Sequence, residues 1–121
     1  MATHKEFVML VDTLIELTQE KEITWLRSDT PHVLLINGTQ IKQVYTTMYK
    51  NKDLRVFEEL YKYFTDEDVF HMQARTIISF VDGDNSIFDF PETTNSWDLL
   101  KAIQYRDVDI DGFMNDMLGN L

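Results

Sequence analysis

Short polar turns between β-rich segments are the sequence feature that most constrains the fold of this chain. Asn37-Gly38 is a strong hairpin signal, and further polar turns fall at 50–53, 65–68 and 82–85. Such turns join neighbouring strands, so the middle of the chain predicts an antiparallel sheet. Runs of β-branched and aromatic side chains between the turns predict strands at 41–49, 69–81 and 87–90.

Three other segments decide how many strands the sheet has. Residues 22–28 alternate with a period of two, with Ile23 and Trp25 on one side, which predicts a strand. Residues 32–36 form a short apolar run after Pro31. The spacing of apolar side chains in residues 54–64 fits either a strand or a helix. The hairpin-like segments on both sides favour a strand. We therefore expect four to six strands.

Amphipathic helices are expected at both ends of the chain. Residues 4–20 carry apolar side chains at helical spacing, and Thr3 with Glu6 forms a capping-box pattern. A second helix is expected at 96–106, capped by one of residues 93–96. Its inward side chains would be Trp97, Leu100 and Ile103.

A last short helix is expected to begin at Asp109 or Asp111, because acidic residues are favoured at a helix N-terminus. Its apolar side would consist of Phe113, Met114, Met117 and Leu118. The sequence thus predicts a single α+β domain over residues 1–121. In it, an N-terminal helix and a C-terminal helical segment pack on one antiparallel sheet.

Composition excludes several classes of protein. Hydrophobic residues make up 44% of the chain and there is no cysteine, which excludes disulfides and thiol catalysis. The apolar runs are far shorter than the roughly 20 residues that span a membrane, and the N-terminus lacks the pattern of a secretory signal. We expect a cytoplasmic protein with no membrane contact and no cofactor.

The net charge of −10 is concentrated near the C-terminus. Residues 82–121 carry nine acidic and two basic side chains, a net −7. Direct binding to nucleic acid needs basic side chains and is not expected. An acidic surface suits a protein partner with a basic surface, including a nucleic-acid-binding protein that an acidic mimic would inhibit. The plainer alternative is that the charge only maintains solubility.

Asp107, Asp109, Asp111 and Gly112 match positions 1, 3, 5 and 6 of an EF-hand calcium loop. Position 12, which should be a bidentate Glu, is Leu118. Only three residues follow it, so the exiting helix is missing. The three aspartates are therefore candidates for a weak calcium site, and the start of an acidic helix is the alternative.

No residue pattern specifies a reaction. The histidines lack metal-ligand spacing, and there is neither a Gly-x-Ser-x-Gly elbow nor a phosphate-binding Gly-rich loop. We therefore expect a non-enzymatic protein-interaction module. Tyrosine is common at interface hot spots, and the tyrosines of neighbouring strands would form an aromatic face. The candidate interaction residues are Tyr45, Tyr49, Tyr61, Tyr63, Asp107, Asp109, Asp111 and Asp116.

The segment from Thr18 to Trp25 has the pattern Thr, four residues, Ile-x-Trp after an amphipathic helix. In this it resembles small bacterial proteins of unassigned function that are encoded by phages or conjugative elements. Ser96-Trp97 and the apolar residues after it fall where the C-terminal helix of those proteins would lie. The resemblance implies an α+β fold and carries over no catalytic or ligand residue.

Overall fold

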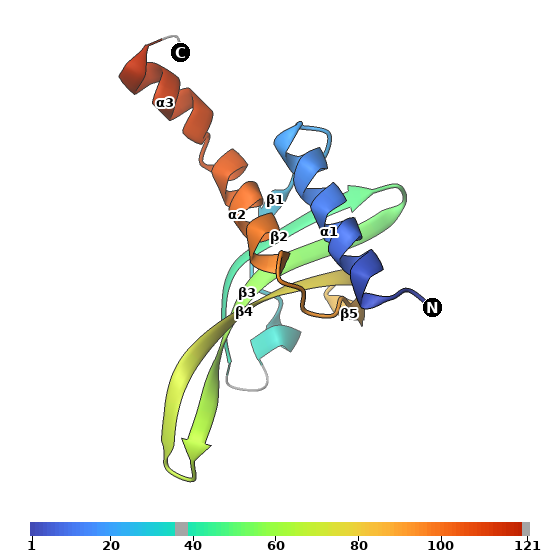
Figure 1. The fold of residues 1–121 in the computed structure, drawn as a ribbon, viewed down its shortest axis with the longest axis vertical. Helices are drawn as coiled ribbons and strands as arrows, with labels where there is room; N and C mark the ends of the chain where they lie inside the picture. Colours follow the sequence, from blue (N-terminus) through green and yellow to red (C-terminus); the bar gives the residue numbers. More distant parts are fainter. Residues whose placement is uncertain (36–38, 120–121) are drawn as a thin grey trace.

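The computed structural model describes residues 1–35 and 39–119, which form an α+β fold in which an N-terminal helix and a C-terminal helical segment lie on the same side of an antiparallel sheet (Figure 1). This confirms the predicted fold class. In chain order the elements are α1 (His4–Gln19), β1 (Leu26–Ser28), the 3₁₀ helix η1 (His32–Leu35), β2 (Gln40–Tyr49), β3 (Lys52–Asp66), β4 (Val69–Asp82), β5 (Asn85–Asp89), α2 (Ser96–Asp107) and α3 (Ile110–Leu118).

The five strands pair in sequence order as an antiparallel meander. Lys50 and Asn51 both have positive φ, at 51° and 65°, as a two-residue turn between twisted strands requires. Gly83, with φ of 61°, serves the turn into β5. These turns confirm the hairpins predicted there, whereas Asn37-Gly38 lies outside the described residues.

Residues 54–64 are strand, as their hairpin-like flanks indicated. They form the middle of β3 and pair with β4 in a register that places Val56 opposite Ile78. Val56 is wholly buried and Ile78 is nearly so. The alternative prediction of a helix at 54–64 is therefore wrong.

Both ends of helix α1 are capped by hydrogen bonds. The Thr3 hydroxyl accepts from the Glu6 amide while the Glu6 carboxylate accepts from the Thr3 amide, which confirms the capping box. At the other end Lys21 has a φ of 67°, and the amides of Lys21 and Glu22 donate to the carbonyls of Thr18 and Leu17. This is a Schellman ending with lysine at the left-handed position.

That ending corrects the strand predicted for 22–28. Ile23 and Trp25 are buried, as their alternation indicated, but they belong to an irregular segment that leaves the helix. Only Leu26–Ser28 pairs with β2. The apolar run after Pro31 is also not extended, because His32–Leu35 forms η1.

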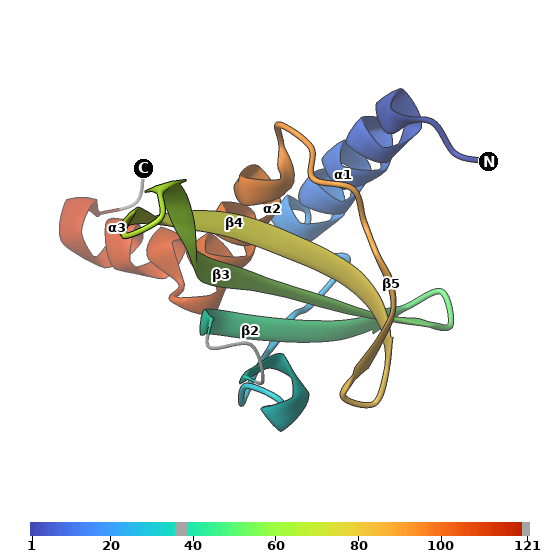
Figure 2. The same cartoon turned by 90° about the horizontal axis from the view of Figure 1, so that it is seen from below.

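The core lies between α1, α2 and one face of the sheet. Figure 2 shows both helices over that face, with η1 on the opposite side. The α2 residues Leu99 and Leu100 are wholly buried, as is Val11 of α1. Trp97 was predicted to point inward, but its side chain is about half exposed. The other buried core residues include Leu14, Tyr45, Leu54, Val56, Ile78, Phe90 and Ile103.

The buried amide of Asn95 links the two helices. Its Nδ2 donates to the Val8 carbonyl at 2.9 Å and to the Asp12 carboxylate at 2.7 Å, both on α1. Asn95 precedes α2 at the N-cap position without a capping hydrogen bond from its side chain. Its side chain therefore docks α2 against α1. Of the helices within the described residues, none is long and apolar enough to cross a membrane.

Candidate functional site

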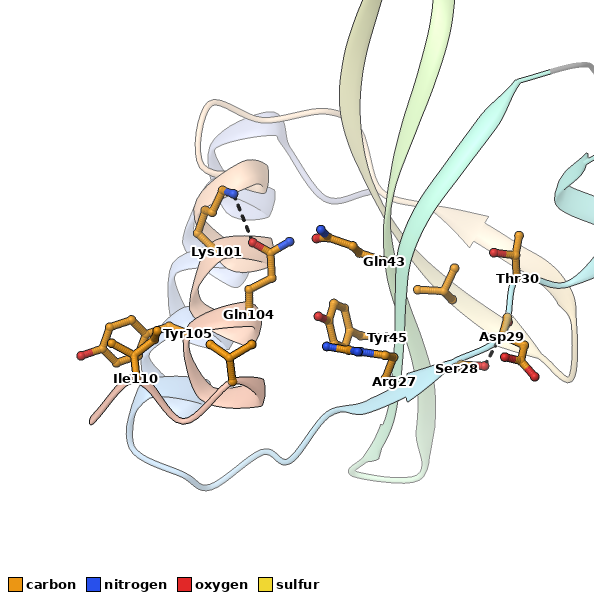
Figure 3. A pocket seen from close by; sticks show the side chains of 12 residues that line it. Arg27, Ser28, Asp29, Thr30, Gln43, Tyr45, Lys101, Gln104, Tyr105 and Ile110 are labelled. Carbon is orange, nitrogen blue, oxygen red and sulfur yellow. Dashed lines mark hydrogen bonds between the residues drawn. The ribbon is translucent and has the colours of Figure 1, made fainter. Parts of the chain in front are cut away.

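A groove of about 780 Å³ lies between α2 and the β1–β2 edge of the sheet (Figure 3). Gln43 lies at a β-bulge in β2 with a φ of 55°, and its side chain points across the groove towards Gln104. The other lining residues include Arg27, Ser28, Asp29, Thr30, Tyr45, Lys101, Tyr105, Val108 and Ile110.

Several polar side chains of this groove form hydrogen bonds or ion pairs. Arg27 forms an ion pair with Asp107, and the Tyr45 hydroxyl donates to the same carboxylate at 3.3 Å. Lys101 donates to Gln104 at 3.1 Å. The pattern is that of a polar seam that holds α2 against the sheet.

Two pKa values in the seam follow from these contacts. Burial raises the pKa of Tyr45, and the neighbouring Asp107 carboxylate raises it further, while Arg27 opposes both. The hydrogen bond to Asp107 raises the pKa of Arg27, which is charged throughout the physiological range. Tyr45 thus acts in the structure as a neutral hydrogen-bond donor.

The three aspartates of the EF-hand-like segment are engaged separately. Asp107 pairs with Arg27, Asp109 accepts from the Gly112 amide as the N-cap of α3, and Asp111 accepts from the Tyr105 hydroxyl. Across the described parts of the chain, no group of three or more His, Cys, Asp or Glu side chains is placed to hold a metal ion. The structure accounts for these aspartates by capping and pairing.

The acidic residues after position 81 do not form one surface. Asp82, Asp84 and Asp89 lie around β5, whereas Asp109 and Asp111 lie at the start of α3. Figure 2 places β5 and α3 on opposite sides of the molecule. A continuous acidic face, on which nucleic-acid mimicry depends, is therefore not formed by this segment.

The four candidate tyrosines do not share a face of the sheet, which corrects the expectation of one aromatic surface. Tyr45 pairs with Val56 and Tyr49 with Lys52, so both lie on the helix-covered face. Tyr61 and Tyr63 occupy the alternate positions of β3 and lie on the opposite face. Tyr45 is buried in the core, whereas Tyr63 is about half exposed.

Helix α3 has an apolar side that no described part of the chain buries. Ile110, Phe113, Met114, Met117 and Leu118 repeat at i, i+3, i+4, i+7 and i+8, and we call them the α3 stripe. No residue of α3 is buried, and the exposed fraction of Phe113 is 62%. The sequence predicted this apolar side, but not that it faces solvent.

The distal part of the β3–β4 hairpin, residues 60–74, projects beyond the rest of the fold, and we call it the arm (Figure 1). Cross-strand pairing divides its two faces. The face opposite the helices carries a polar ladder in which the Tyr61 hydroxyl donates to Gln73, and Gln73 contacts His71. The face on the helix side, here the arm face, consists of Leu60, Lys62, Phe64, Phe70 and Met72.

The arm face is apolar and largely uncovered. Phe64 and Phe70 pair across the strands with ring centres 5.4 Å apart, and their side chains are 57% and 44% exposed. Met72 is also exposed. Sequence reasoning missed this surface, although Phe70 and Met72 alternate with His71 and Gln73 after the turn at Glu67 and Asp68.

Comparison of the chain with models of known protein families, with curated proteins and with solved structures found no match. The resemblance to proteins of mobile elements therefore stays a prediction.

Proposed function

We propose that this protein is a non-enzymatic interaction module that binds a protein partner through the α3 stripe and the arm face. The observation that carries the proposal is α3 itself: a fully amphipathic helix whose apolar side chains are all left outside the core. Contiguous exposed apolar surface is costly in water, and in folded proteins it marks sites of association.

The negative charge of helix α3 also suits it to binding a partner. Asp109, Asp111 and Asp116 flank the stripe, and no basic residue lies within the helix. An apolar partner surface that also carries basic side chains would complement both features. The apolar contact would supply most of the affinity, and the aspartates would contribute orientation and rate of association.

Affinity capture from a host-cell lysate tests the proposal, with two variants of α3 compared with the wild type. Phe113→Asp places a charge in the stripe, whereas Asn115→Asp adds the same charge on the polar side of the helix. We expect captured protein to be lost with Phe113→Asp and kept with Asn115→Asp. Equal capture by all three forms would show that α3 is not the contact.

The salt dependence of the same capture separates the two sources of affinity. Screening weakens exposed ion pairs but leaves apolar contact intact. Retention through washes from about 0.1 M to about 1 M salt supports an interface centred on the stripe. Complete elution at low salt would instead favour the acidic-mimic alternative.

A further inference from the structure

We infer that the partner of the α3 stripe is the arm face of a second copy of this chain. Each copy would lay its α3 across the arm of the other, so that two identical contacts close a dimer with twofold symmetry. This inference rests on the proposed function, because it names the partner of the same surface.

The two surfaces match in length and chemistry. A nine-residue helix is about 13.5 Å long, and the arm face extends about 13 Å along β3 from Leu60 to Phe64. Both surfaces present aromatic and methionine side chains, which adapt to one another on packing. Within residues 1–35 and 39–119, the aromatic and methionine side chains of both surfaces are exposed.

Charge complements the apolar match. Lys62 lies in the middle of the arm face, with its ammonium 4.7 Å from the centre of the Phe70 ring. Among the described residues Lys62 is in neither of the two ion pairs, which are Arg27 with Asp107 and Arg75 with Glu59. The aspartates that flank the α3 stripe supply the missing opposite charge.

The α3 of a chain does not cover its own arm. Only Val108 and Asp109 separate α2 from α3, and Asp109 is fixed in the left-handed region, with φ of 50°, by its hydrogen bond to the Gly112 amide. Figure 1 shows α3 and the arm leaving the sheet in divergent directions. A second copy brings an α3 to each arm without any change in this geometry.

The area available is that of a stable dimer. Burying about half of an aromatic or methionine side chain removes roughly 100 Å² from water. The six aromatic and methionine side chains of one stripe and one arm face would then remove about 600 Å². Two symmetric contacts give about 1,200 Å², the lower limit for specific protein complexes.

Sedimentation equilibrium of the full chain at several concentrations tests the inference first. We expect a mass of twice 14.3 kDa. We also expect Phe113→Asp and Phe70→Asp each to weaken association by at least about thirty-fold, as loss of a hot-spot aromatic does. Asn115→Asp on α3 and Gln73→Glu on the polar side of the arm are matched controls and should stay dimeric. All four residues lie outside the core, so circular dichroism should show the wild-type fold.

Mixing the two disruptive variants gives a sharper test. In a mixed pair, the intact α3 of the Phe70→Asp chain meets the intact arm of the Phe113→Asp chain, so one contact of the two is unaltered. We expect the mixture to associate more tightly than either variant alone. Contacts between like surfaces, stripe to stripe or arm to arm, predict no such recovery.

Cysteine crosslinking locates the contact, because the chain has no cysteine of its own. Met117→Cys combined with Met72→Cys should form an intermolecular disulfide under mild oxidation, whereas Asn115→Cys with Met72→Cys should not. A dimer that resists Phe70→Asp would overturn the inference.

The outcome also separates this inference from the proposed function. A wild-type chain that stays monomeric to about 100 μM, yet captures another protein through Phe113, would overturn the self-association and leave the function standing. A monomer that captures nothing through Phe113 would overturn both.

Discussion

The indole nitrogen of Trp25 donates to the hydroxyl of Thr18, 3.0 Å away, and that hydroxyl in turn donates to the Leu14 carbonyl. Both side chains are buried, with Thr18 1% exposed. The contact ties the segment after α1 back onto the helix it has just left. It gives the threonine and tryptophan of the Thr-x₄-Ile-x-Trp pattern a structural role.

Thr18→Val should lower the free energy of unfolding by about 1–3 kcal/mol, because the buried Trp25 N–H would lose its acceptor. Urea unfolding followed by tryptophan fluorescence measures the change. Thr13→Val is a matched control, since the Thr13 hydroxyl donates to the Met9 carbonyl at an exposed site. Its effect should stay within about 0.5 kcal/mol. Equal losses from the two variants would show that the hydrogen bond to Trp25 contributes nothing.

Arg55→Met should leave the free energy of unfolding unchanged or raise it by up to about 2 kcal/mol. Arg55 is 1% exposed, and only its Nη1 has a hydrogen-bond partner among the described residues, the Asp84 carbonyl at 2.9 Å. Burial accordingly lowers the pKa of Arg55, although Asp89 and Asp84 partly offset the effect. An apolar side chain of similar length keeps the packing and removes a poorly compensated charge.

Arg55→Ala separates the packing of that side chain from its charge. It leaves a cavity beside Phe57, whose ring centre lies 5.6 Å from the guanidinium carbon. We expect a loss of about 2–4 kcal/mol in chemical unfolding. A loss of that size from Arg55→Met as well would mean that the charge itself stabilises the fold.

Stability should fall above about pH 10 through Tyr45. Its pKa is raised in the folded chain by burial and by Asp107, so the folded state holds the proton more tightly than the unfolded state does. The stabilisation is fully present below the unfolded pKa of about 10 and is lost as pH rises towards the folded value. Urea unfolding of wild type and Tyr45→Phe at pH 8 and at pH 10.5 checks this. The phenylalanine variant should lose less stability between the two; parallel losses would rule Tyr45 out.

Calcium at about 1 mM should leave the melting temperature unchanged. Asp107, Asp109 and Asp111 already serve an ion pair, an N-cap and a hydrogen bond to Tyr105, so their carboxylates do not converge. A ligand raises stability only when it binds the folded state. A calcium-dependent rise in thermal unfolding that Asp109→Ala abolishes would restore the EF-hand interpretation.

Local patterns predicted most of the fold. The capping box at Thr3, the polar turn after Tyr49 and the turn at Gly83 each specify backbone angles through a few neighbouring side chains. Because hairpins are local, the antiparallel sheet followed from them. The strand at 54–64 followed from its neighbours rather than from its own period, since a buried strand and a short helix share that pattern.

Features that depend on distant residues were not predictable in this way. Trp25 alternates like a strand residue, but its burial depends on α1 and α2 rather than on strand pairing. The exposure of Trp97 and of the α3 stripe depends on how α2 and α3 lie relative to the rest of the fold, which their own periodicity does not specify. Which face of the sheet each candidate tyrosine lies on depends on the strand register, which includes a β-bulge between Lys42 and Tyr45.

The strand order of the sheet has a kinetic consequence. Each strand pairs with its neighbour in sequence, so the hairpins can form early with little loss of chain entropy. The contacts of Asn95 with Val8 and Asp12 join residues 87 and 83 positions apart, and they bring the two ends of the chain together. Docking of the helices should therefore follow the sheet in the order of folding. Asn95→Ala would then mainly speed unfolding in denaturant-dependent rate measurements, whereas a change in the Lys50–Asn51 turn would mainly slow refolding.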